Sequence, residues 1–256
     1  MRIRALVIVA MLASVACGAT ASLFRQYEYE EEVYLSLDGT ATVYVHSSIA
    51  ALNALRGTNF DASPTARFER EPFRDYFSTA VTRVTRVSSS RRSGRRFVHV
   101  RLEVDDVTRL GEAAPLAWST YRFRRDGDLF VYRQQVGAAA GKEVGKAGWT
   151  GRELVAFRLH LPSKIRWDNS GHAVGRGNIV GWEQPLTDRL RGTPIEIEAR
   201  MDPQSILYRT LWLFGATYVA VAGAFGIVIW WIIRRGTPAV PAADMTLTSG
   251  GGAPRA

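Results

Sequence analysis

The sequence predicts an α+β fold, a mainly antiparallel sheet with a few helices, followed by one C-terminal transmembrane helix. Three observations lead to this prediction. Alternating apolar and polar residues recur through residues 22–208, and a period of two is typical of half-buried strands. Asp-Gly pairs stand between two pairs of these runs, as in tight β-hairpins. Residues 210–233 are apolar and uncharged, and this length is enough to cross a bilayer.

The first 21 residues have the features of a secretory signal peptide. Two arginines precede an apolar run at 5–16, which is too short for a comfortable membrane-spanning helix. Ala19 and Ala21 then provide the small side chains that a signal peptidase requires. We therefore expect a signal peptide over residues 1–21, with cleavage after Ala21.

Cys17 supports an alternative processing route. The segment SVAC that ends at Cys17 resembles the lipobox of bacterial lipoproteins, in which the cysteine is lipidated, although Ser14 stands where Leu is usual. Cys17 is the single cysteine of the chain, and residues 22–208 contain no Asn-x-Ser/Thr acceptor. Eukaryotic ectodomains of this size usually carry disulfides or glycosylation sites. The sequence therefore favours a bacterial envelope protein.

Strand signals dominate the exported region, residues 22–208. Asp38-Gly39 and Asp126-Gly127 each separate two β-rich runs, and Gly accepts the positive φ that a tight hairpin turn requires. A third hairpin is expected to have a longer loop at 88–95. The runs that predict strands are 27–37, 41–45, 81–87, 97–104, 118–123, 129–136, 154–161, 165–167, 178–182 and 195–201.

Helical signals are fewer. A serine pair precedes the apolar run 49–56 and Gly57 follows it, which is the usual pattern of a helix start and stop. A second short helix is expected over 70–80, and a single turn at 107–110. The Gly-rich segment 137–151 is expected to be the most flexible internal loop.

The apolar run at 210–233 is expected to span the membrane once. Arg234 and Arg235 follow it, and the positive-inside rule then places the tail 234–256 in the cytoplasm. Residues 22–208 would lie on the extracytoplasmic side of the bacterial inner membrane. The tail is rich in Gly, Pro, Ala and Thr and is expected to be disordered.

Small residues recur on one face of the expected span. Ala216, Ala220 and Ala224 are spaced four residues apart, and such a face permits close helix–helix contact. The sequence is therefore compatible with a homodimer through this face. The ordinary Ala content of a spanning helix explains the same spacing.

The net charge of +9 is not concentrated in the exported region. Six of the 33 basic residues and one of the 24 acidic residues lie outside 22–208, which leaves that region with four excess positive charges. Thirty of the basic residues are Arg. Because this imbalance is small, we expect no nucleic-acid partner.

No motif in the sequence predicts catalysis, a metal or a cofactor. The four histidines lack the spacing of a zinc site, Gly-x-Ser-x-Gly is absent, and removal of Cys17 would leave no thiol. We therefore expect that the protein is not an enzyme. Asp105-Asp106 is expected to cap the helical turn that follows it. The acidic stretch Glu28, Glu30, Glu31 and Glu32 is expected to lie on a solvated strand face.

Two groups of side chains are candidate ligand-binding residues. Arginines follow one another without an intervening acid on the third hairpin, namely Arg83, Arg86, Arg91, Arg92, Arg95, Arg96 and Arg101. Such a group attracts anionic lipid headgroups, and the alternative is an ordinary solvated hairpin with an Arg-rich loop. Four tryptophans, Trp118, Trp149, Trp167 and Trp182, are expected to line an apolar cavity for an acyl chain or to pack in the core.

The order of these segments resembles a known bacterial family. The hairpin segment LDGTATVYV is followed by GRRFVHVRLEVDDVTRL, FRRDGDLFVY and LHLPSKIRWDNSGHAVGRGNIVGW, and then by a single span. This order is similar to that of LppM-like envelope proteins and the related cyanobacterial DUF3153 group. The resemblance implies an α+β exported domain that binds a lipid or glycolipid, without an assigned activity.

Together, these observations predict a single-span bacterial envelope protein. Its exported domain would bind an amphiphile (a lipid or glycolipid) or a partner at the membrane surface, without catalysis. One alternative is an envelope scaffold or assembly factor that acts by protein contacts only. Another is a hydrolase whose site the sequence does not reveal.

Overall fold

The computed structural model describes residues 25–171 and 178–236. The predictions for the signal peptide, Cys17, Ala19, Ala21 and the tail beyond residue 236 lie outside these residues. The chain divides into two compact units, 1–208 and 209–256, and each is described by itself.

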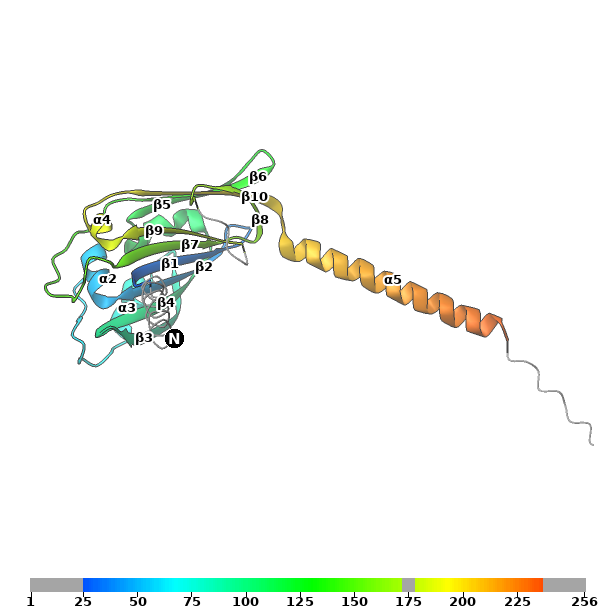
Figure 1. Cartoon of the computed structure of the whole chain (residues 1–256), viewed down its shortest axis with the longest axis horizontal. Helices are drawn as coiled ribbons and strands as arrows, with labels where there is room; N and C mark the ends of the chain where they lie inside the picture. Colours follow the sequence, from blue (N-terminus) through cyan, green and yellow to red (C-terminus); the bar gives the residue numbers. More distant parts are fainter. Residues whose placement is uncertain (1–24, 172–177, 237–256) are drawn as a thin grey trace, which may run out of the picture. The chain divides into compact units, whose positions relative to one another are not determined.

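The folded unit contains two sheets (Figure 1). The six-stranded sheet has the order β3-β4-β2-β1-β7-β9, and the four-stranded sheet has the order β5-β6-β10-β8. All paired strands are antiparallel except β1 and β7, so the α+β prediction is confirmed. The strands are β1 Tyr27–Leu35, β2 Ala41–Ser48, β3 Arg83–Arg92, β4 Arg95–Val104, β5 Ser119–Asp126, β6 Leu129–Val136, β7 Leu154–His160, β8 Ser163–Asp168, β9 Ile179–Pro185 and β10 Ile195–Ser205.

Both Asp-Gly pairs lie where a hairpin was expected. β1 and β2 are joined by residues 36–40, in which Gly39 has φ +88°. β5 and β6 are joined by the two-residue turn Gly127-Asp128, because Asp126 already pairs with Leu129, and Gly127 has φ +59°. Asp38 also accepts hydrogen bonds from the backbone N–H and hydroxyl of Thr40. The glycine of each Asp-Gly pair therefore supplies the positive φ that its connection requires.

The third hairpin differs from the prediction of a long loop at 88–95. β3 continues to Arg92 and β4 begins at Arg95, so that only Ser93 and Gly94 form the turn. Both have positive φ, +51° and +71°, which matches the twist of the flanking strands. Because this turn is so short, the arginines near it are strand residues and alternate between the two faces of the sheet.

The helices α2 Ile49–Arg56, α3 Glu71–Phe77, α4 Leu186–Leu190 and α5 Ile206–Arg234 and the 3-10 helices Val107–Glu112 and Ala114–Leu116 complete the fold. The Ser48 hydroxyl accepts from the N–H of Ala51 at the start of α2, and Gly57 ends that helix with φ +72°. Asp106 caps the first 3-10 helix through the N–H of Thr108. The caps confirm both ends of the predicted helix 49–56 and the start of the predicted turn at 107, which continues to Glu112. α3 is shorter than the predicted 70–80, and α4 was not predicted.

The hydrophobic core lies between the two sheets and the short helices. Val43 of β2, Leu55 of α2, Tyr132 of β6 and Ile197 of β10 are all buried in one cluster. The sequence predicted helices laid on a sheet. In the structure, the four-stranded sheet supplies much of this cover, because the alternating apolar residues of β5, β6 and β10 form an apolar face of their own.

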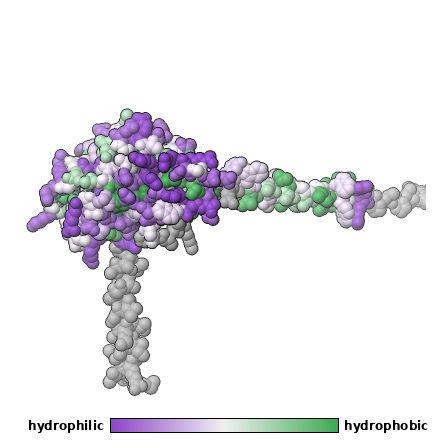
Figure 2. Space-filling view, turned by 90° about the horizontal axis from the view of Figure 1, so that it is seen from above, coloured by the Kyte–Doolittle hydropathy of each residue, from purple (hydrophilic) through white to green (hydrophobic). Residues whose placement is uncertain are grey.

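Helix α5 is long and apolar enough to span a membrane. Its most apolar window of 18 residues has a mean hydropathy of 2.0, and apolar side chains cover it in Figure 2. The guanidinium groups of Arg234 and Arg235 lie over the rings of Trp230 and Trp231, at 4.9 and 3.7 Å from the ring centroids. This helix confirms the predicted C-terminal candidate span, whereas the homodimer through its alanines stays a prediction.

Candidate functional site

The six-stranded sheet has a core face and a polar face. Successive strand residues point to opposite faces, so that β1 sends Tyr29, Glu31 and Val33 into the core. The other face carries polar and aromatic side chains that are partly exposed. We call it the polar face, and define it by Glu30, Glu32, Tyr34, Tyr44, His46, Ser90, His99, Arg101, Arg158 and His160.

Three of these side chains form a hydrogen-bonded chain across three strands. The hydroxyl of Ser90 on β3 lies 2.8 Å from Nε2 of His99 on β4. Nδ1 of His99 lies 2.9 Å from Nδ1 of His46 on β2. His99 therefore contacts a hydroxyl through one ring nitrogen and a second imidazole through the other.

Glu32 joins the same face from β1. Its carboxylate lies 3.5 Å from Nε2 of His160 and 3.4 Å from Nη1 of Arg158, and it accepts a hydrogen bond from the Tyr34 hydroxyl. The Tyr34 and His160 rings stack at 3.8 Å. The contact with His160 is the largest of those that lower the pKa of Glu32.

A pocket of about 240 Å³ opens beside Ser90. Tyr27, Arg92 and Phe97 line it together with Glu30 and the histidine pair. Arg92 donates a hydrogen bond to the carbonyl oxygen of Tyr27, and its guanidinium lies 4.5 Å from the centroid of the Phe97 ring. The pocket thus places a cation, two aromatic rings and the Ser90 hydroxyl around one space.

Burial lowers the pKa of both His46 and His99 below 6.5. The folded state therefore keeps these imidazoles neutral at a pH where the unfolded chain takes up protons. We expect the free energy of unfolding of the full chain in detergent to fall as the pH decreases below 6.5. A His46→Gln/His99→Gln variant should lose part of this dependence in urea titrations at several pH values.

Other charged groups surround the histidine pair, namely Glu30, Glu32, Arg92, Arg101, Arg158 and His160. Burial raises the pKa of Glu30, so its contribution is lost as pH rises and has the opposite sign. Comparing variant with wild type isolates the histidine contribution, and an identical pH dependence in both would contradict the prediction.

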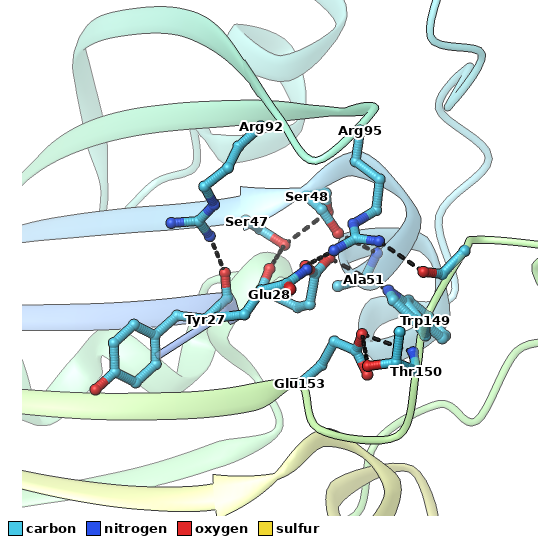
Figure 3. A network of polar contacts seen from close by, with 12 residues as sticks. Tyr27, Glu28, Ser47, Ser48, Ala51, Arg92, Arg95, Trp149, Thr150 and Glu153 are labelled. Carbon is cyan, nitrogen blue, oxygen red and sulfur yellow. Dashed lines mark hydrogen bonds and ion pairs between the residues drawn. The ribbon is translucent and has the colours of Figure 1, made fainter. Parts of the chain in front are cut away.

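A second polar network lies at the end of the sheet nearest the β3–β4 turn (Figure 3). Glu28, which follows Tyr27 at an irregularity of β1, is 0% exposed. Its carboxylate lies 2.9 Å from Nη2 of Arg95 and accepts hydrogen bonds from Nε1 of Trp149 and from the Gln26 amide. Glu28 is thus a buried ion-pair partner of Arg95 on the β3–β4 hairpin. A buried ion pair stabilises a fold only where hydrogen bonds satisfy its remaining polar atoms, and the contacts of Glu28 do this.

The loop that carries Trp149 is tied to the same network. Glu153 accepts hydrogen bonds from the backbone N–H groups of Thr150 and Gly151, both at 2.8 Å. Arg95 donates to the carbonyl oxygen of Gly148. The Gly-rich segment 137–151 is therefore fixed at this end by side-chain contacts.

Beside this network lies a pocket of about 410 Å³, which we call the basic pocket. Ser63, Ser93, Gly94, Arg95, Arg96 and Lys146 contribute to its lining, which contains no acidic residue. Arg96 is buried and donates to the carbonyl oxygens of Asp61 and Ala66, while its Nε has no acceptor within the described part of the chain. The pocket is suited to an anionic group.

Glu31 of β1 is 1% exposed and lies between the two sheets. One carboxylate oxygen accepts from the Tyr121 hydroxyl and the Gln134 amide, both at 2.9 Å, and the other accepts from the Tyr29 hydroxyl at 3.1 Å. Burial raises its pKa. The expectation of a solvated acidic face is wrong for Glu28 and Glu31, because each has buried donors that replace water.

The structure distributes the predicted arginines over several environments. Arg83 pairs with Glu103, Arg86 and Arg91 are exposed, and Arg92 lines the pocket beside Ser90. Arg95 and Arg96 line the basic pocket. These last two are brought together with Lys146, which the sequence did not single out.

The four tryptophans are not brought together in one cavity. Trp118 is buried against Tyr29 and Phe157, with the guanidinium groups of Arg56 and Arg189 at 4.7 and 5.4 Å from its ring centroid. Trp182 is buried and donates to Asn169. Trp149 binds Glu28, and Trp167 is 48% exposed beside Arg200. None of them lines either pocket described above.

Sequence reasoning did not find the chain Ser90–His99–His46. Its members lie on three strands and have no common sequence spacing, so only the pairing register brings them together. Within residues 25–171 and 178–236, no group of three His, Cys, Asp or Glu side chains is placed to hold a metal ion.

Comparisons with known proteins give one weak similarity. No protein-family model matches the chain, and no curated protein matches it in sequence. The NMR structure of the folded domain of LppM from Mycobacterium tuberculosis matches with a TM-score of 0.38 and 12% identity, over 70% of this chain and 92% of that domain.

Proposed function

We propose that this protein is a bacterial envelope protein, anchored by α5, whose folded unit binds an anionic amphiphile. The proposed binding is non-catalytic, with residues 22–208 on the extracytoplasmic side of the inner membrane. The observation that carries the proposal is the basic pocket, which three basic residues and no acidic residue line.

The basic pocket combines fixed and free positive charge. Arg95 and Arg96 are held by buried contacts, so their charges are pre-organised at little entropic cost on binding. Lys146 is exposed, and its ammonium has no hydrogen bond or ion pair to other described residues. Lys146 is therefore the residue that is best placed to close on a phosphate group.

We expect Lys146→Glu to weaken binding of dioctanoyl phosphatidylglycerol by about tenfold or more, because reversal of one charge beside two guanidinium groups changes the binding free energy by more than ~1.4 kcal/mol. The measurement is isothermal titration calorimetry with the full chain in detergent. Lys164→Glu on β8 makes the same change at another exposed position and should bind like wild type.

Two further ligands separate the possible outcomes. Dioctanoyl phosphatidylcholine, which has no net charge, should bind far more weakly, and glycerol phosphate should compete if the headgroup alone is recognised. Equal binding of both lipids, or equal loss in both lysine variants, would contradict the basic pocket as the site. Folded protein that binds neither lipid would leave the scaffold function in its place.

A further inference from the structure

The contact between Ser90 and His99 joins diagonal neighbours of the β3–β4 pair. The residue directly opposite His99 on β3 is Ser88, and Ser90 is its diagonal neighbour. The His99 ring nevertheless lies 2.8 Å from the Ser90 hydroxyl. A hydroxyl within hydrogen-bond distance of an imidazole, which a third group orients in turn, is the arrangement of an activated nucleophile.

One assignment of the protons makes these three side chains a continuous hydrogen-bonded series. If Ser90 donates to Nε2 of His99, then Nδ1 of His99 carries a proton and donates to Nδ1 of His46. His46 then carries its own proton on Nε2. Ser90, His99 and His46 therefore form a consistent relay, with His99 as proton acceptor.

The pocket beside Ser90 supplies the other requirements of acyl transfer. Ser90 is exposed and can be reached by a ligand. Arg92 lies two residues further along β3 on the same face and lines the same pocket, so its guanidinium can stabilise a developing oxyanion. The volume of about 240 Å³ and the rings of Tyr27 and Phe97 suit a short acyl group.

We propose that Ser90, His99 and His46 form a catalytic site that hydrolyses short-chain carboxylic esters. The Ser90 oxygen bonds to the ester carbonyl carbon while its proton moves to Nε2 of His99. The carbon–oxygen bond to the leaving group breaks, and the alcohol departs with that proton. Water then attacks the acyl-Ser90 ester and gives its proton to His99. Collapse of the intermediate releases the carboxylic acid and returns the proton to Ser90.

His46 is a positioning residue in this scheme. It holds the His99 ring with Nε2 toward Ser90 and does not touch the substrate. The site is separate from the basic pocket and shares no lining residue with it. Ester hydrolysis at this site is therefore independent of the ligand binding proposed for the basic pocket.

The test uses the full chain in detergent with p-nitrophenyl acetate as the probe. We expect a burst of nitrophenol with one acetyl group on Ser90, detected by peptide mass spectrometry after acid quenching. Ser90→Ala should hydrolyse the probe no faster than detergent alone. His99→Gln should lower the acylation rate about 100-fold or more, which is the usual contribution of a general base. Ser88→Ala removes the neighbouring hydroxyl of the same strand and should behave like wild type.

Two results would overturn the proposal. Unchanged hydrolysis by Ser90→Ala would show that a surface imidazole acts without the serine, and an acetyl group on any residue other than Ser90 would show that Ser90 is no nucleophile. His46 is tested by a pair of variants. His46→Asn retains an acceptor for the His99 N–H and should keep more activity than His46→Leu at equal thermal stability. Equal activity in this pair would remove His46 from the site. Circular dichroism melts verify that each variant is folded.

Discussion

Replacement of Glu31 by Leu is expected to lower the free energy of unfolding by about 3 kcal/mol, because three buried donors lose their acceptor and each unpaired buried group costs roughly 1–3 kcal/mol. The donors are the hydroxyls of Tyr29 and Tyr121 and the amide of Gln134. They come from both sheets, so Glu31 links the two layers. The apolar gain of the leucine and the relief of a buried charge offset only part of this loss.

The measurement for Glu31→Leu is thermal unfolding of the full chain in detergent, followed by circular dichroism. A loss of about 3 kcal/mol corresponds to a decrease in Tm of roughly 6–12 °C for a unit of this size. Glu196→Leu makes the same change at an exposed position of β10 and should shift Tm little. A similar Tm for both variants would contradict the role of Glu31.

Glu31→Gln separates hydrogen bonding from charge. The amide oxygen of Gln can still accept from two donors, and the Tyr29 hydroxyl can rotate so that its oxygen accepts from the amide NH2 group of Gln. Because burial raises the pKa of Glu31, the carboxylate is disfavoured in the fold and its contribution to stability is lost as pH rises through that pKa. We therefore expect Glu31→Gln to retain most of the stability at neutral pH.

The second large effect concerns membrane attachment through α5. A Val221→Arg/Val228→Arg variant places two charges inside the apolar helix, and each costs about 2.5–3.5 kcal/mol of insertion free energy near the helix centre. We expect the variant to appear in the soluble fraction after alkaline carbonate extraction, whereas the wild-type chain stays in the membrane pellet. The change is visible by immunoblotting of the two fractions.

Val221→Leu/Val228→Leu changes the same positions without adding charge and should remain in the pellet. If the double arginine variant also remains there, α5 is not the segment that holds the protein in the membrane. The mass of the purified chain then shows whether residues 1–21 are still attached and provide a second apolar anchor.

Short-range sequence patterns predicted most of the helices and turns, because interactions between residues close in sequence determine these elements. Gly39 and Gly127 can adopt positive φ because they have no Cβ, and Ser48 caps α2 through a hydrogen bond three residues away. The long loop expected at 88–95 was wrong for the same reason. Ser and Arg have weak strand preferences, and here the pairing of β3 with the neighbouring β4 extends the strand beyond what its own residues indicate.

In the acidic stretch of β1, the alternation of residues predicts the environment of some glutamates but not of Glu31. Alternation assigns Glu30 and Glu32 to one face, and both are partly exposed as expected. Glu31 falls on the core face, where a carboxylate is normally excluded. It is tolerated because Tyr121 and Gln134 from the other sheet donate to it, and these partners are about a hundred residues away in sequence.

Short-range sequence patterns were enough to predict the α+β class, the two hairpins with Asp-Gly pairs, the helix caps and the apolar C-terminal helix. All of these depend on residues within a few positions of one another. Which polar residues meet depends instead on the tertiary fold. The chain Ser90–His99–His46, the ion pair of Glu28 with Arg95 and the basic pocket with Lys146 each join distant segments. Their formation depends on strand register, and a shift of one residue would turn each strand side chain to the opposite face.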